Sequence, residues 1–238
     1  KVESNIASTI ETLSLCMPVL DCYSKLIKQV HEKRYYPALK TLEILESEHL
    51  PKVSHYRFAA TAISENIPRL KKEIKSLDDF CNFLEKVRDY SPNIGERALR
   101  HTKESQKRSL KSVIEEHQAK INEEYSIDDD DLCAQDMIDF SPIYRCLHIY
   151  TVLDDKDYFA KYYQKQRREQ AKLVLQAPQA MHDNMEAYKK YIYSIVGFFV
   201  VEDHVMNTTG GEFVTKIYFE DLWNTSLTKA INVLSMCS

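Results

Sequence analysis

A stripe of apolar side chains opens the chain and restricts its fold more than any other feature of the sequence. Its members are separated by four, three, four and three residues, a spacing that places them on one face of an α-helix over nearly three heptads. They are Ile6, Ile10, Leu13, Met17 and Leu20. Ile27 continues the register after the polar Ser24, and Pro18 is expected to kink or interrupt the helix. The stripe starts without a cap, so we expect a longer natural helix with a coiled-coil partner upstream.

The rest of the chain has little material for tight turns. Four glycines and seven prolines among 238 residues disfavour a fold made of many short strands. A hydrophobic content of 44% is ample for a core. The sequence therefore predicts an all-α protein.

Prolines and caps are predicted to divide the first half into separate helices. One helix, with Leu39, Leu42 and Leu45 inward, is expected to end before Pro51, and residues 53–74 to form another that is interrupted at Pro68. Ser91 before Pro92 has the pattern of a cap followed by a proline at the first helical position, which predicts a new long helix towards residue 125. From Thr102 onward this helix is mostly charged, so it is expected to project or fray.

The negative charge of the chain is confined to a short connector. Residues 1–124 carry a net charge of +2, residues 125–139 carry −6, and residues 140–238 carry zero. The four consecutive acids Asp128 to Asp131 repel one another, so we predict a first helical bundle over 1–124, a flexible acidic linker over 125–139 and a second helical bundle over 140–238. Neither bundle has the positive excess of a nucleic-acid-binding protein, and no nucleic-acid partner is expected.

Similar signals predict the helices of the second half. Ser141, followed by proline, starts one helix, and the next ends near Gln176. Asp183 and Glu186 form a capping box that opens a third helix. Within it, residues 191–201 are uncharged and apolar on all sides. This run is shorter than the ~20 residues that an α-helix needs to span a bilayer. We therefore predict a buried helix segment there.

Reactive residue types are present but form no recognisable catalytic or metal site. The six cysteines have no CxxC spacing and are expected to be reduced thiols of a cytosolic protein. His204 beside Glu202 and Asp203, and Cys146 near His148, have no further ligand at helical spacing, so core or surface histidines are favoured. Glycine-rich phosphate loops and nucleophile elbows are absent from the sequence. We predict no enzyme activity, no metal and no cofactor.

A basic and aromatic segment is the best candidate for an interaction surface. Its cationic residues are Lys161, Lys165, Arg167, Arg168 and Lys172. With Tyr158, Tyr162 and Tyr163, they have the composition to meet an acidic partner helix or anionic lipid headgroups, which attract each nearby basic residue by ~1 kcal/mol. The alternative is a helix with a solvated basic face and tyrosines in the core, which the zero net charge of residues 140–238 favours over lipid contact.

Five segments resemble a single family. Two lie in the second half, at residues 140–176 and from Ile195 to His204. Three lie in the first half, from Arg34 to Glu43, from Pro51 to Phe58 and from Asn66 to Lys75. In this order, and over nearly the whole chain, they are similar to the Sec-fifteen family of exocyst subunits. The exocyst is the complex that tethers secretory vesicles to the plasma membrane.

The resemblance implies an elongated rod of stacked antiparallel helical bundles, of which this chain is a middle segment. It implies a non-catalytic role in the cytoplasm, at secretory vesicles and the plasma membrane, with other exocyst subunits as partners and weak peripheral contact with anionic membrane. The Rab GTPase site of the family lies in a C-terminal domain outside this chain, so no residue here is assigned to it. Residues 106–135 are shorter than the charged insert of animal members. An unrelated intracellular helical adaptor or scaffold is the alternative.

Overall fold

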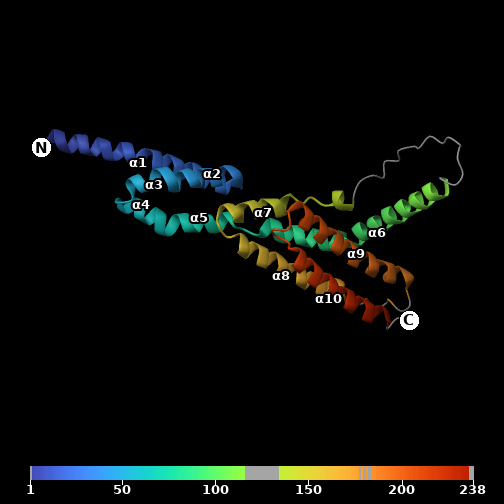
Figure 1. The fold of residues 1–238 in the computed structure, drawn as a ribbon. Coiled ribbons are helices and arrows are strands. Elements are labelled where there is room, and N and C mark those ends of the chain that lie inside the picture. Colours follow the sequence, from blue (N-terminus) through green and yellow to red (C-terminus); the bar gives the residue numbers. More distant parts are fainter. Residues whose placement is uncertain (1, 116–133, 177, 179–180, 182–183, 236–238) are drawn as a thin grey trace. The chain divides into compact units, whose positions relative to one another are not determined.

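The computed structural model describes residues 2–115, 134–176, 178, 181 and 184–235 (Figure 1). All regular structure within these ranges is helical, which confirms the all-α fold class. The elements of the first part are α1 (Val2–His31), α2 (Tyr35–Ile44), η1 (Leu45–His49), α3 (Leu50–Val53), α4 (Arg57–Thr61), η2 (Ala62–Asn66), α5 (Ile67–Ile74) and α6 (Asp78–Glu115). Those of the second part are η3 (Ala134–Met137), α7 (Ser141–Val152), α8 (Lys156–Val174), α9 (Met185–Thr208) and α10 (Lys216–Ser235).

Contacts divide the chain into two compact units. Residues 1–79 and 143–159 form the first unit, and residues 80–142 and 160–238 form the second. These units differ from the predicted bundles over 1–124 and 140–238, because most of α7 packs with the first unit and most of α6 with the second. Much of the predicted acidic linker, including Asp128 to Asp131, lies outside the described residues.

In the first unit, α1 packs against α2 through a face that the predicted stripe does not include (Figure 1). The buried apolar residues of α1 are Cys16, Val19, Leu26 and Val30. The stripe that contains Leu13 and Met17 lies one position further along the helix, about 100° around its axis. Its large apolar side chains, from Ile6 to Ile27, are 43% to 58% exposed, so they are not part of the core of this unit. Pro18 lies inside the helix, which continues through it.

The prediction that a helix ends before Pro51 is wrong. After α2, the chain continues through the π-helical turn η1 into α3, which contains Pro51. The N–H of Leu50 donates to the carbonyl of Leu45, five residues earlier. Proline has no N–H, and its ring clashes with the carbonyl four residues earlier in an α-helix. A wider turn directly before Pro51 relieves this conflict, so the chain stays helical.

The predicted interruption at Pro68 is also a π-helical turn rather than a break. The turn η2 precedes α5, and the N–H of Ile67 donates to the carbonyl of Ala62. The actual break in the region 53–74 comes earlier, at residues 54–56, where Tyr56 adopts an extended conformation before α4. In both cases one residue separates the end of the π-helical turn from the proline. Neither proline ends the helix in which it lies.

No new helix starts at Ser91, contrary to the sequence prediction, because α6 passes through Pro92 as one continuous helix. The Ser91 hydroxyl is buried and donates to the carbonyl of Val87 at 2.7 Å. Apolar residues on both sides of Pro92 are buried, and this shared packing outweighs the one backbone hydrogen bond that proline removes. They are Phe80, Phe83, Leu84, Val87 and Ile94. From Thr102 to Arg108 the helix is almost wholly exposed, as its charged sequence predicts.

The helix α7 packs within the first unit through polar and aromatic contacts. The Tyr150 hydroxyl donates to the carbonyl of Lys75 at 2.9 Å, and directly after α7 the Asp155 carboxylate lies 2.7 Å from the Lys75 ammonium. The rings of His148 and Tyr36 are stacked, with centroids 5.8 Å apart. These contacts join residues about 80 and 110 positions apart, which is why α7 belongs with the first unit rather than the second.

The second unit has an aromatic core between α6, α8, α9 and the loop before α10. The Tyr163 ring lies 5.9 Å from Phe80 and 4.7 Å from Phe213, measured between centroids. In the apolar run of α9, residues 192–196 are half-buried, and the fully buried members include Tyr191 and Val201. The run is therefore buried only in part, mainly towards its C-terminal end, and half-buried elsewhere. Within the described ranges, no helix has both the length and the hydrophobicity that a bilayer crossing requires.

The start of α9 differs in one detail from the predicted capping box. Its cap is Asn184, whose side-chain oxygen accepts a hydrogen bond from the backbone N–H of Glu186 at 2.9 Å. Asp183, the predicted cap, lies outside the described residues. An N-cap of this type satisfies one of the backbone donors at the start of a helix, which fixes where α9 begins.

Candidate interaction surfaces

The five predicted cationic residues of α8 do not form one surface. Lys161, Lys165, Arg168 and Lys172 are exposed, and their spacing of four, three and four residues places them on one face. The side chain of Arg167 is only 1% exposed. The prediction that Arg167 belongs to an exposed interaction surface is therefore wrong.

Arg167 is buried because a carboxylate on the next helix pairs with it. Its Nε donates to Oε1 of Glu202, which is 0% exposed and also accepts a hydrogen bond from the Tyr163 hydroxyl at 2.8 Å. One terminal nitrogen of Arg167 donates to the side-chain oxygen of Gln170 at 2.6 Å. The guanidinium carbon also lies 4.1 Å from the centroid of the Phe198 ring. Tyr163, Arg167 and Glu202 are named here the Arg167 cluster.

The electrostatics of the Arg167 cluster indicate a structural role. Burial lowers the pKa of Arg167, but the Glu202 carboxylate and Tyr163 raise it by more, so the guanidinium stays charged. Burial and then Glu202 raise the pKa of Tyr163 well above its ordinary value, so its hydroxyl stays protonated and donates. Because the cluster is enclosed, no external partner can reach its charges. Gln170 extends the cluster to α6 by donating to the carbonyl of Leu84 at 2.9 Å.

The exposed cationic face of α8 is partly engaged with neighbouring side chains. The guanidinium of Arg168 lies 4.9 Å from the centroid of the Tyr218 ring and 3.7 Å from a carboxylate oxygen of Asp221 on α10. The Lys172 ammonium lies 2.7 Å from Glu169 on its own helix. Of the three tyrosines in this segment, Tyr163 is in the core, Tyr162 is half-buried and Tyr158 is exposed. Lys161 and Lys165 are the two cations of this face whose side chains form no hydrogen bond or ion pair with another described residue.

An apolar stripe of α1 stays exposed beside the face through which this helix packs on its own unit. We call this stripe the α1 seam, and its residues are Ile6, Ile10, Leu13, Met17, Leu20, Ser24 and Ile27. The spacing corresponds to alternating d and a positions of heptads, with Ser24 at an a position. Between residues 4 and 20, Glu11 is the sole charged residue. A strict a/d stripe is the pattern of a coiled-coil seam, which is narrower than the apolar face of an ordinary surface helix.

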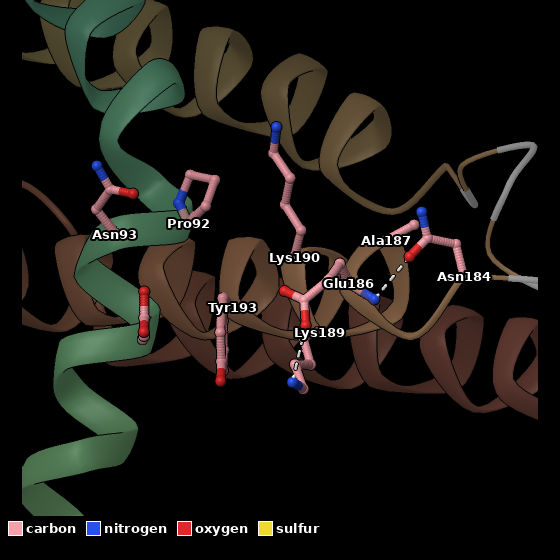
Figure 2. A pocket seen from close by; sticks show the side chains of 9 residues that line it. Pro92, Asn93, Asn184, Glu186, Ala187, Lys189, Lys190 and Tyr193 are labelled. Atoms are coloured by element: carbon pink, nitrogen blue, oxygen red, sulfur yellow. Dashed lines mark hydrogen bonds and ion pairs between the residues drawn. The ribbon is translucent and has the colours of Figure 1, made fainter.

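A polar groove of about 450 Å³ lies between α6 and the first turns of α9 in the second unit (Figure 2). Three of its four charged groups have ion-pair partners, Glu186 with Lys189 at 2.9 Å and Glu96 with Arg100 at 3.2 Å, and the fourth is Lys190. Asn184, the cap of α9, also lines it. The lining has equal numbers of acidic and basic side chains and no nucleophile paired with a base, so it does not have the arrangement of a catalytic site.

The histidine and cysteine residues considered from sequence lie in packed surroundings. The His204 ring is 4.2 Å from the Phe140 ring, centroid to centroid, and burial lowers the pKa of His204. Cys146 is buried in α7. In the part of the chain that the structure describes, no three metal-ligating side chains are grouped as a metal site would require. Cys133 and Cys237 lie outside that part.

Comparison of the sequence with known proteins finds one family and relatives that share its name. Residues 1–99 match the family described as exocyst complex component EXOC6/Sec15, N-terminal. The chain is 54% identical over 250 residues to exocyst complex component 6 of Drosophila melanogaster, an alignment that covers 100% of this chain and 32% of that protein. It is 44% identical over 260 residues to the Homo sapiens protein of the same name, covering 98% of this chain and 32% of that protein.

A more distant relative extends this similarity. Exocyst complex component 6 of Caenorhabditis elegans is 34% identical over 259 residues, which cover 96% of this chain and 32% of that protein. No solved structure matches the chain. The chain spans about a third of the length of these curated relatives. These similarities show that the chain belongs to the exocyst complex component 6 (Sec15) family, of whose members it corresponds to one segment.

Proposed function

We propose that this chain is a non-catalytic segment of an exocyst subunit that helps tether secretory vesicles to the plasma membrane before fusion. It acts through protein–protein contacts with other exocyst subunits, in the cytoplasm and at the two membranes that are joined. Contact with a Rab GTPase is proposed for a C-terminal domain outside this chain. The stacked-bundle rod implied by the resemblance is part of this proposal. The family similarity supports it, since the names of the relatives identify components of that complex.

The observation that carries the proposal is the α1 seam. Six large apolar side chains at heptad spacing are each 43% to 58% exposed, although α1 already packs on its own unit through a second face. Exposed apolar surface of this continuity is a mark of a protein interaction site. An isolated helix gains nothing from presenting such a stripe to water. We therefore propose that the α1 seam packs against a helix of another exocyst subunit.

Replacing Leu13 and Leu20 with glutamate should abolish this contact. Each buried leucine contributes about 1.5–3 kcal/mol, so losing two of them and burying two charges weakens binding by at least about a hundredfold. The measurement is co-purification of the other exocyst subunits with the full-length protein. A matched variant, Ser8→Glu with Lys25→Glu, adds the same residue type on exposed positions of α1 outside the seam and should co-purify normally. Equal recovery with both variants would remove the support that the α1 seam gives to the proposal.

We also propose that the exposed face of α8, formed by Lys161, Lys165, Arg168 and Lys172, contacts an acidic helix of a partner subunit. Weak peripheral contact with anionic membrane is the lesser part of this proposal. Its support is the charge and the exposure of this face. Arg168 and Lys172 have partners within the chain, so Lys161 and Lys165 are the cations best placed for an external contact.

Reversing the charge of Lys161 and Lys165 to glutamate should weaken subunit co-purification by several-fold, because exposed ion pairs contribute at most about 1 kcal/mol each. The control is Lys216→Glu with Lys229→Glu, which makes the same charge change on α10. Sedimentation with vesicles that contain phosphatidylserine distinguishes contact with anionic membrane from contact with a partner subunit. Loss of sedimentation with normal co-purification would assign the face to membrane, and no change in either assay would leave it a solvated face.

A further inference from the structure

The serines and threonines of α1 divide into those with a defined hydrogen-bond partner and those without one, and Ser24 belongs with Ser4 and Ser8 to the second group. The side chains of Thr9, Thr12 and Ser14 donate to backbone carbonyls four residues earlier at 2.7, 2.9 and 2.8 Å. The Ser24 hydroxyl makes no hydrogen bond to any described group, and the residue is exposed. Ser24 is also the one polar residue of the α1 seam, with Leu20 and Ile27 as its neighbours in the stripe. Its hydroxyl therefore depends on water or on a partner molecule.

The surface around Ser24 fits one helix of limited width. The apolar side chains of the α1 seam are each 43% to 58% exposed and occupy only the a and d positions, the narrow pattern of a contact between two helices. The position that follows each d residue is small in the first two heptads, at Ala7 and Ser14, and charged in the two heptads next to Ser24, at Asp21 and Lys28. A helix that lies on a membrane surface has instead a wide apolar face and a strongly charged opposite face. The a/d stripe thus favours a partner helix over a lipid surface.

We propose that Ser24 is a specificity-determining residue of the α1 seam, selecting a partner helix that places a polar side chain opposite it. This inference rests on the proposed function, in which the partner is a helix of another exocyst subunit. A purely apolar partner would strip water from the hydroxyl without replacing its hydrogen bond, which is unfavourable. A partner with Asn, Gln or Ser at the facing core position pairs with it. Single polar residues at a positions fix the register of coiled coils in this way, at some loss of stability.

The test compares the affinity of the full-length protein for each of the other exocyst subunits, purified and measured singly. The quantity of interest is the ratio between the dissociation constants of the weaker-binding subunits and that of the tightest. With Ser24→Leu, this ratio should fall by about tenfold or more, because apolar partners gain affinity while the polar partner loses its hydrogen bond. Ser24→Asn should retain the ratio. The matched control is Ser8→Leu, which makes the same change on an exposed position outside the seam.

Four outcomes are decisive. A lowered ratio with Ser24→Leu and an unchanged ratio with Ser8→Leu supports the assignment. An unchanged ratio with Ser24→Leu overturns it. If Leu13→Glu with Leu20→Glu still abolishes binding in that case, the α1 seam is the contact surface but Ser24 does not determine its specificity. If that double variant binds normally, the α1 seam is not the contact surface. The proposed function then loses the support that the α1 seam gives it. If the wild-type protein alone dimerises in sedimentation velocity and the double variant does not, the occupant is a second copy and the proposal fails.

Discussion

Replacing Glu202 with alanine is expected to lower the free energy of unfolding by about 3–5 kcal/mol, because it leaves the charge of Arg167 buried without its partner. Arg167 and Glu202 are 1% and 0% exposed, so water cannot take the place of the lost carboxylate. The hydroxyl of Tyr163 loses its acceptor in the same variant. Substitutions of surface residues seldom change the free energy of unfolding by this much. A loss of this size would therefore identify the Arg167 cluster as part of the core.

Urea unfolding followed by circular dichroism measures this effect. A matched control is Glu169→Ala, which removes an exposed carboxylate from α8 and should leave the midpoint of unfolding unchanged. The double variant Arg167→Met with Glu202→Leu should recover most of the stability, since an apolar pair of similar size avoids the desolvation of both charges. If Glu202→Ala unfolds at the wild-type midpoint, the carboxylate is not paired in solution as the structure has it.

The helices of the second half could be predicted closely because their signals are local. The start of α7 at Ser141 follows from a serine before a proline, and the end of α8 at Val174 lies near the predicted end at Gln176. The same kind of signal was misleading at Pro51 and Pro92. There, packing of residues on both sides of the proline keeps one helix, with a π-helical turn before Pro51. Local propensity is a weak guide wherever tertiary contacts are continuous.

The candidate site could be predicted only in part, because sequence shows which residues share a face but not what covers it. Periodicity found the α1 seam, yet α1 has a second apolar set, which includes Val19 and Leu26, and only the structure shows that this set is the buried one. Arg167 was assigned to a surface because its partner Glu202 lies 35 positions away. One signal was available: Glu202 directly follows the apolar run that ends at Val201, where an acid needs a buried counter-charge.

Two glycines were also missed, although glycine within a helical pattern often marks a close approach of backbones. Gly95 lies in α6 and Gly197 in α9, both within the second unit. A Cβ atom on Gly95 would lie 1.8 Å from the carbonyl oxygen of Tyr193, and one on Gly197 would lie 1.8 Å from that of Ser91. The two helices therefore meet backbone to backbone, and the obstacle at each position is a main-chain atom that cannot rotate away.

Gly197→Ala is consequently expected to destabilise the protein by about 3 kcal/mol or more, at the upper end of the range for overpacked sites, because α6 and α9 must move apart. Gly95→Ala should have a similar effect. The double variant should cost less than the sum, since one separation of the helices relieves both clashes. Gly210→Asn is the control, because a side chain there meets open space and asparagine tolerates its φ of +67°. A Gly197→Ala protein that unfolds in urea at the wild-type midpoint would show that the helices do not cross this closely.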